Sequence, residues 1–163
     1  MLLLGLIKKT NPLKNQLEIT LQNRKNLHAI LEQTPNEDLL KIPQGFRNNI
    51  WWNIAHVVVT QQILVYKLSG LQMRVPEALV DKFKKGTVPD GTATDAEMKM
   101  VADFLLSTIT WTKEDYEAGL FKNFNEYTTS AKVTLRNVQD AADFNLFHEG
   151  IHLGSIFAIR KML

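Results

Sequence analysis

The segment of residues 50–68 is apolar on almost every side, and this property constrains the fold more than any other feature of the chain. A helix on the surface of a bundle has one polar face, whereas the apolar residues of this segment cover more than one face. The β-branched residues 57–59 would also suit a strand, but the length of the segment and its lack of Gly and Pro favour a helix. We therefore expect a long helix that Asn48 or Asn49 caps and that ends near Gly70. It lies either at the centre of a bundle or in a subunit interface.

Three further helices are predicted from the spacing of apolar residues and from capping signals. Residues 12–34 carry leucines and isoleucines three and four positions apart, which is typical of an amphipathic helix. Thr94 and Glu97 match the capping-box pattern and predict a third long helix that ends near Gly119. The last helix is expected to begin near Asn137 and to run to the end of the chain.

The segments between these helices are rich in Pro, Gly and polar residues. Residues 35–45 indicate a connecting loop, and residues 75–94 indicate a second loop with a helical turn at 77–83. Residues 121–135 carry few helix signals and allow an irregular or briefly extended crossover. Four helices in a chain of 163 residues predict an all-α fold, with a single domain that spans residues 1–163.

The composition excludes several classes of function. The 19 basic and 17 acidic residues nearly cancel and are mixed along the chain, so no basic stripe indicates nucleic-acid binding. No apolar run approaches the roughly 20 residues that cross a membrane, and the opening residues lack the basic leader and the cleavage pattern of a signal peptide. The absence of Cys excludes disulfides, thiolate ligands and a Cys nucleophile. It is compatible with the cytoplasm, where we place the chain.

Two histidines, His148 and His152, lie four residues apart in the last predicted helix. They share a stripe with apolar residues, so both imidazoles are expected to face the core, with Cβ atoms about 5 to 6 Å apart. His56 lies in the apolar segment 50–68, where an unpaired imidazole would be costly to bury. Three converging histidines leave one position open on a zinc-type ion, which is typical of catalytic rather than structural sites. The stripe consists of Ala141, Phe144, His148, His152, Ser155, Ile159 and Met162.

Two other interpretations of the histidines stay open. In the first, each histidine is an ordinary core or surface residue whose ring is satisfied by hydrogen bonds. We interpret His28 in this way, because its neighbours are polar. The run from His148 through Glu149 to His152 also fits the short zinc-protease pattern. Proteases of that class take their third ligand downstream, however, and no His, Asp or Glu follows His152. Glu149 is then a partner of a ligand, a proton shuttle or an ordinary helix carboxylate.

Several polar and aromatic side chains lie at helical spacing from the histidines and are candidates for a surrounding pocket. They are Asn49, Trp52, Asn53 and Thr60 on the helix of His56, and Asn145, Glu149 and Ser155 on the last helix. The alternative is that they are capping or surface residues. The sequence contains no Gly-rich phosphate loop, nucleophile elbow or dinucleotide fingerprint.

Two motifs of the chain resemble the DinB-like superfamily of metal-dependent four-helix bundles. One is residues 51–56, Trp-Trp-Asn-Ile-Ala-His, and the other is residues 148–161, which begin His-Glu-Gly-Ile-His. The resemblance implies an up-up-down-down four-helix bundle in which His56, His148 and His152 hold a divalent metal, most often zinc or nickel. It also implies a homodimer. The superfamily includes thiol S-transferases and isomerases that use low-molecular-weight thiols such as bacillithiol, mycothiol or glutathione.

Three functions are therefore compatible with the sequence. The leading hypothesis is an enzyme, a thiol S-transferase or hydrolase, whose three-histidine divalent metal site activates a thiol or water for a small-molecule substrate. The runner-up is a non-catalytic metal-binding or dimerisation module, which the apolar segment 50–68 and the absence of a clear general base favour. The third is a plain structural bundle whose histidines bind no metal. No residue set identifies a particular substrate or thiol.

Overall fold

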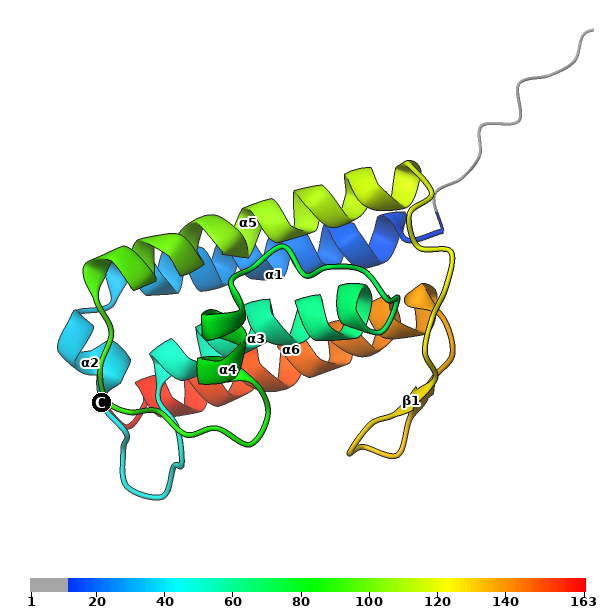
Figure 1. Cartoon of the computed structure of the whole chain (residues 1–163). Coiled ribbons are helices and arrows are strands. Elements are labelled where there is room, and N and C mark those ends of the chain that lie inside the picture. The colour runs from blue at the N-terminus through cyan, green and yellow to red at the C-terminus, as the bar shows by residue number, and fades with distance from the viewer. Residues whose placement is uncertain (1–11) are drawn as a thin grey trace, which may run out of the picture.

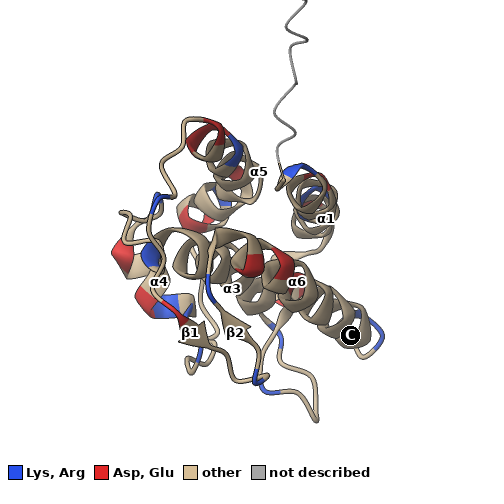
Figure 2. Cartoon of the chain, turned by 90° about the vertical axis from the view of Figure 1, so that its right-hand side faces the viewer, with Lys and Arg blue, Asp and Glu red and all other residues tan. Residues whose placement is uncertain are grey.

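The computed structural model describes residues 12–163, so the opening residues considered for a signal peptide lie outside the described part of the chain. The four long helices are α1 (Lys14–Gln33), α3 (Ile50–Gln62), α5 (Asp95–Glu117) and α6 (Val138–Arg160) (Figure 1). Helices α1 and α3 each pack against both α5 and α6, and Figure 2 shows α1 beside α5 in one layer and α3 beside α6 in the other. The predicted all-α fold is confirmed. Within the described residues, no helix combines the length and the hydropathy needed to cross a membrane.

The directions of the long helices differ from the predicted order. In Figure 1, α1 and α6 run from right to left, whereas α3 and α5 run from left to right. The order is therefore up-down-down-up, and the expected up-up-down-down order, with its first two helices parallel, is wrong. The connections explain the difference. The link between α1 and α3 returns the chain antiparallel, whereas the longer link between α3 and α5 travels back along the bundle before α5 begins.

Helix α3 lies at the centre of the hydrophobic core. All residues from 50 to 59 are buried, so the apolar pattern reflects a central position within one chain rather than a subunit interface. Asn49 caps the helix, because its side-chain oxygen accepts a hydrogen bond from the backbone N–H of Trp52 at 2.8 Å. Beyond Gln62 the helix widens into a π-helical turn, η1 (Ile63–Lys67), and the chain then turns at Gly70 with a φ of +71°.

Short elements occupy the links between the long helices. Helix α4 (Glu77–Phe83) coincides with the predicted helical turn. Strand β1 (Tyr127–Thr128) pairs antiparallel with β2 (Thr134–Leu135) inside the predicted crossover. Helix α2 (Asn36–Leu40) lies where a plain loop was expected. It forms because the carbonyl of Pro35 accepts the first helical hydrogen bonds and because Leu39, 1% exposed, is buried in the core.

Helices α5 and α6 begin at the predicted residues. The Thr94 hydroxyl accepts a hydrogen bond from the backbone N–H of Glu97 at 3.1 Å, and the side chain of Asn137 accepts one from Asp140 at 2.9 Å. The carboxylate of Glu97 binds Lys82 Nζ at 3.0 Å instead of the backbone of Thr94, so only the Thr94 half of the expected capping box forms.

The buried stripe of α6 is rotated from the predicted one. Of the predicted stripe, Phe144, Ser155 and the two histidines are only partly buried, and Met162 is exposed. The fully buried residues are Ala141, Ala142, Asn145, Glu149, Ile156 and Ile159. The difference arises because a polar amide and a carboxylate occupy core positions, which a search for apolar residues passes over. His148 and His152 therefore flank the core, on the side of α6 that faces α3.

Candidate metal centre

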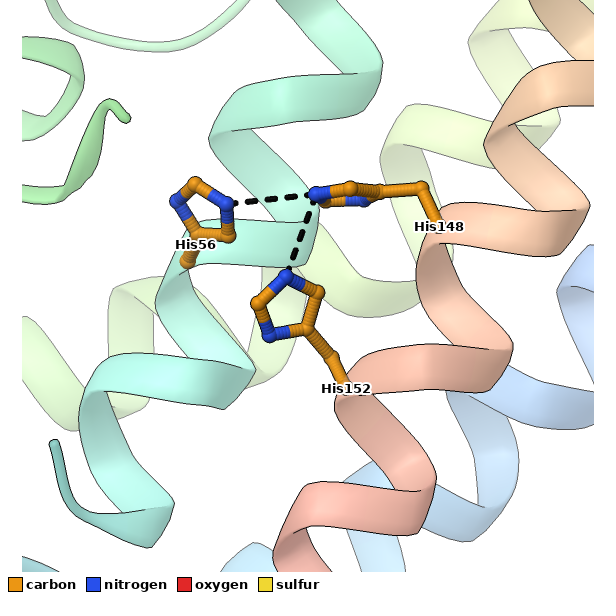
Figure 3. A group of neighbouring side chains, drawn as sticks. All are labelled: His56, His148 and His152. Atoms are coloured by element: carbon orange, nitrogen blue, oxygen red, sulfur yellow. Dashed lines mark hydrogen bonds between the residues drawn. The ribbon is translucent and has the colours of Figure 1, made fainter. Parts of the chain in front are cut away.

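The three predicted ligands come together from two helices that pack against each other. His56 lies in the middle of α3 and is 4% exposed, while His148 and His152 lie one turn apart on α6 and are partly buried. Figure 3 shows the three imidazole rings pointing toward one another across the space between these helices. His28 lies apart from this cluster on α1, where its imidazole pairs with the carboxylate of Glu32 at 3.3 Å.

The spacing of the ring nitrogens suits a metal ion. His148 Nε2 lies 3.2 Å from His56 Nε2 and 3.1 Å from His152 Nε2. Nitrogens that bind zinc at about 2.0 to 2.1 Å are separated by about 2.9 Å at right angles and about 3.4 Å at the tetrahedral angle. The two observed separations fall between these values. Nitrogens this close repel one another through their lone pairs unless a proton or a cation lies between them.

The backbone fixes the proton of His56. The Nδ1 atom of this ring lies 2.6 Å from the carbonyl oxygen of Phe83, the last residue of α4. A carbonyl only accepts hydrogen bonds, so His56 Nδ1 carries the proton and donates it. The Nε2 atom is then left with its lone pair directed into the cluster, which is the form that a metal ligand requires.

An amide side chain fixes the proton of His152 in the same way. Its Nδ1 atom lies 2.7 Å from the side-chain oxygen of Asn53. The nitrogen of that amide donates to the side chain of Asn48 at 3.0 Å and to the carbonyl of Asn49 at 2.7 Å, so the orientation of the amide is settled by two acceptors. Asn53 therefore presents its oxygen to the ring, and His152 Nε2 is free to accept a metal.

Among the three candidate ligands, His148 is the one whose second nitrogen has no such partner. Its Nδ1 atom is buried and makes no hydrogen bond. The ring is held by its position on α6 and by the two neighbouring imidazoles at its Nε2 atom. Rings of metal ligands are normally oriented by a hydrogen bond to the outer nitrogen, so the placement of His148 depends more on the helix that carries it.

Burial keeps all three imidazoles neutral. It lowers the pKa of His148 to about 2 and that of His152 to about 3, and the repulsion between neighbouring rings adds to the effect. Burial also lowers the pKa of His56, against a smaller opposing effect of its hydrogen bond to Phe83. At neutral pH the rings therefore carry no charge, and their lone pairs are available to a cation without prior loss of a proton.

Two more of the predicted pocket residues contact the cluster. The indole of Trp52 stacks on the His56 ring with centroids 4.4 Å apart, and its Nε1 atom donates to the hydroxyl of Thr87 at 3.1 Å. The hydroxyl of Thr60 lies 3.3 Å from His56 Nε2. Trp52 therefore restrains the plane of one ligand, while Thr60 places a hydroxyl beside the position where a metal would bind.

The remaining predicted pocket residues form their hydrogen bonds with groups other than the three rings. Asn49 is occupied as the cap of α3, and its amide nitrogen donates to the carbonyl of Leu40 at 2.8 Å. The hydroxyl of Ser155 donates to the carbonyl of Ile151 within α6 at 3.0 Å. Asn145 and Glu149 are buried on the side of α6 that faces α1, and the amide of Asn145 donates to Glu149 at 2.8 Å.

Glu149 has a cationic partner that the sequence interpretation missed. Arg24 on α1 is 0% exposed, and its Nη2 atom lies 2.8 Å from Glu149 Oε1. The amide of Asn23 donates to Glu149 Oε2 at 2.9 Å. The carboxylate is thus directed away from the histidines and is engaged by three donors, which disfavours a role as proton shuttle or as the general base of a zinc protease.

A signal for Arg24 was present in the sequence. The buried positions Leu17, Thr20, Arg24, Leu27 and Leu31 of α1 follow one another at spacings of three and four residues. An arginine on such a stripe must be paired inside the core, because an isolated buried charge is too costly. The carbonyl of Phe83 had no such signal, since a backbone atom has no residue type that a pattern can recognise.

Comparison with known protein families identifies the family of the chain. The family model of the DinB superfamily matches residues 19–156, which include the three clustered histidines and most of the four long helices. No curated protein matches the sequence. With its helical fold and its three converging histidines, the chain belongs to the DinB superfamily.

Proposed function

We propose that this protein is a metal-dependent enzyme that binds a divalent ion, zinc or nickel, through His56, His148 and His152. The observation that carries the proposal is the convergence of the three Nε2 atoms, with the outer nitrogens of two rings already committed as donors. Three protein ligands leave a position for a further molecule, whereas structural sites fill all four. The set of neutral imidazoles suits zinc and nickel better than it suits calcium or magnesium.

The reaction that fits the surroundings best is thiol transfer to a small electrophile. A divalent ion held there would lower the pKa of a thiol or water at its remaining position. Among the described residues, the cluster of potential ligands contains no carboxylate, and Glu149 is engaged by Arg24. A thiol is more acidic than water and needs less help from a base, so this environment favours a low-molecular-weight thiol over hydrolysis.

The residues of the chain have distinct tasks in this proposal. Phe83 and Asn53 hold protons on the outer nitrogens of His56 and His152 and so keep the ligand lone pairs directed inward. Trp52 covers one face of the His56 ring and excludes water from it. Thr60 offers a hydroxyl that can donate a hydrogen bond to an anion, such as a thiolate, beside the ligands.

The metal content of the purified protein tests the proposal directly. Elemental analysis of the wild type, beside a His148→Ala/His152→Ala variant, is expected to find about one metal ion per chain in the wild type and none in the variant. His152→Ala alone should abolish tight binding yet keep most of the helical content measured by circular dichroism. The absence of metal from both proteins, even after incubation with zinc and nickel, would remove the basis of the enzyme proposal.

A thiol assay separates the reaction from the metal site. The metal-loaded protein is expected to accelerate conjugation of bacillithiol, mycothiol or glutathione with chlorodinitrobenzene, and the metal-free variant is not. If the loaded protein is inactive with every thiol and electrophile, the runner-up becomes the better description, namely a metal-binding or dimerisation module without catalysis.

One surface supports self-association, whichever of the two descriptions holds. The exposed residues of α6 between positions 147 and 158 include Phe147, Ile151 and Phe157, which are 55, 50 and 48% exposed, and none of the exposed residues there is charged. A face of this kind is typical of a contact with a second copy of the chain. We expect a homodimer in analytical ultracentrifugation and a monomer for Ile151→Glu, with unchanged metal content.

A further inference from the structure

Arg24 contacts both of the helices that carry the histidines, although α1 supplies no ligand itself. Its Nη2 atom donates to the carbonyl oxygen of Val57 on α3 at 2.9 Å, and its Nε and Nη2 atoms donate to the carboxylate of Glu149 on α6 at 2.8 to 3.0 Å. Both side chains of this ion pair are buried, with exposed fractions of 0 and 2%. A single guanidinium therefore joins three helices inside the core.

The two contacted residues are the immediate neighbours of ligands. Val57 follows His56 along α3, and Glu149 follows His148 along α6. The guanidinium is rigid and planar, so the positions of its acceptors fix the separation of the two helices at the level of the metal site. His56 Nε2 and His148 Nε2 are brought to 3.2 Å at this same level.

His148 is also the ligand with the greatest need for such support. The outer nitrogens of His56 and His152 bind Phe83 and Asn53, whereas His148 Nδ1 has no hydrogen-bond partner. The orientation of this ring thus depends on where α6 lies, and the pair of Arg24 with the next residue, Glu149, holds α6 at that turn. His148, whose ring has no hydrogen bond at Nδ1, is thus positioned through the backbone of α6.

Stability alone explains the ion pair poorly. Removing two charges from water is costly, and replacing a buried pair by apolar residues of similar volume is often neutral or stabilising. A buried pair that contributes little net stability still selects one arrangement of the helices, because other arrangements leave a charge unpaired.

We propose that Arg24 is a positioning residue of the metal site, which sets the spacing between α3 and α6 so that His148 meets His56 around one ion. This inference rests on the proposed metal function and names the residues that tune its affinity. The hydrogen bonds of Arg24 go to Val57 and Glu149 and not to the three histidines, so Arg24 acts through these two residues.

Zinc affinity of a charge-balanced variant tests this role. Arg24→Met/Glu149→Leu removes both charges together and so leaves the net charge beside the site unchanged. The expected result is zinc binding about 10- to 100-fold weaker in competition with a chromophoric chelator, a range typical of lost support for metal ligands. The visible spectrum of the cobalt-substituted variant should change as well, while circular dichroism of the metal-free protein should not.

A second variant keeps the test decisive if the first does not fold. Arg24→Lys retains the charge but cannot reach Val57 and Glu149 together with a rigid fork, so zinc affinity should again fall about tenfold or more. Arg74→Lys is the matched control, because Arg74 pairs with Asp115 at 3.0 Å and forms no hydrogen bond with the histidines. This control should bind zinc as the wild type does.

The outcomes separate this inference from the function on which it rests. Wild-type zinc affinity and an unchanged cobalt spectrum in either folded Arg24 variant would overturn the positioning role and leave the metal site intact. An equal loss in the Arg74→Lys control would also overturn it, since the effect would then be general. A wild-type protein that binds neither zinc nor nickel would overturn both proposals.

Discussion

At the scale of single residues, the candidate site is defined by which nitrogen of each imidazole carries its proton. Phe83 accepts from His56, Asn53 accepts from His152, and both Nε2 lone pairs consequently point inward. Neither acceptor is one of the three candidate ligands. The affinity of such a site depends on these partners almost as strongly as on the ligands.

Asn53 provides the residue-scale prediction. Asn53→Ala removes the acceptor of His152 Nδ1, so the ring loses its preferred tautomer and orientation, and zinc affinity should fall about 10- to 100-fold. Competition with a chelator measures the change. Asn53→Asp is the control, since it keeps an oxygen for the ring and should bind more tightly than Asn53→Ala. Equal affinities for the two variants would contradict the assigned role.

The sequence predicted that the three histidines come together, but it did not predict the residues that hold their rings in place. The sequence alone shows that His148 and His152 are four residues apart and that His56 lies among apolar residues. The acceptor of His56 is a backbone carbonyl, which any residue supplies. The pairing of Arg24 with Glu149 spans 125 positions, and only the packing of α1 against α6 brings them together.

At the scale of helices and strands, the caps account for most of what was predictable. Three helices begin at a side chain that accepts a hydrogen bond from a backbone N–H of the first turn, namely Asn49, Thr94 and Asn137. Asn and Thr are preferred at this position, so the sequence predicts these helix starts. The π-helical turn η1 has no comparable signal. It lies beside the buried amide of Gln62, whose oxygen accepts from the backbone N–H of Arg74 at 2.7 Å across the chain.

The cap of α3 gives the prediction at this scale. Asn49 is fully buried, and Asn49→Ala leaves the backbone N–H of Trp52 without its acceptor, so the free energy of unfolding should fall by about 1 to 2 kcal/mol. Urea unfolding of the metal-free protein measures this change. Asn49→Asp restores a capping oxygen and is expected to recover part of the loss. An unchanged unfolding midpoint in Asn49→Ala would show that the cap is dispensable.

At the scale of the whole molecule, the direction of each helix was the part of the fold that local patterns left undetermined. Amphipathic spacing identifies the buried side of a helix but carries no information about which end lies beside which neighbour. The connections decide this. The link between α3 and α5 is long enough to travel back along the bundle, and α5 therefore runs parallel to α3.

The buried histidines predict how the stability of the whole metal-free protein depends on pH. Their pKa values are lowered in the folded state, to about 2 for His148 and about 3 for His152, against 6.5 for an unperturbed imidazole. The unfolded chain therefore binds more protons below pH 6.5. Above pH 6.5 these histidines contribute a constant amount to the free energy of unfolding. Below pH 6.5 the free energy of unfolding falls by about 1.4 kcal/mol per histidine for each unit by which the pH is lowered.

Urea unfolding at pH 7, 6 and 5 measures this dependence, with His148→Gln/His152→Gln as the control. The variant is expected to lose stability less steeply than the wild type as the pH falls from 6.5 to 5. Parallel pH profiles for the two proteins would mean that these rings titrate alike in the folded and unfolded states.

Because the candidate ligands lie on α3 and α6, far apart in the sequence, a bound ion would affect the stability of the fold. His56 and His148 are 92 positions apart along the chain, yet their nitrogens lie 3.2 Å apart. An ion bound between them would cross-link the chain and close a long loop, as a disulfide does, which restricts the unfolded ensemble. The chain has no cysteine, so the bound ion would provide a cross-link that reducing agents do not break. Low pH or a chelator would break this cross-link instead, because each removes the ion.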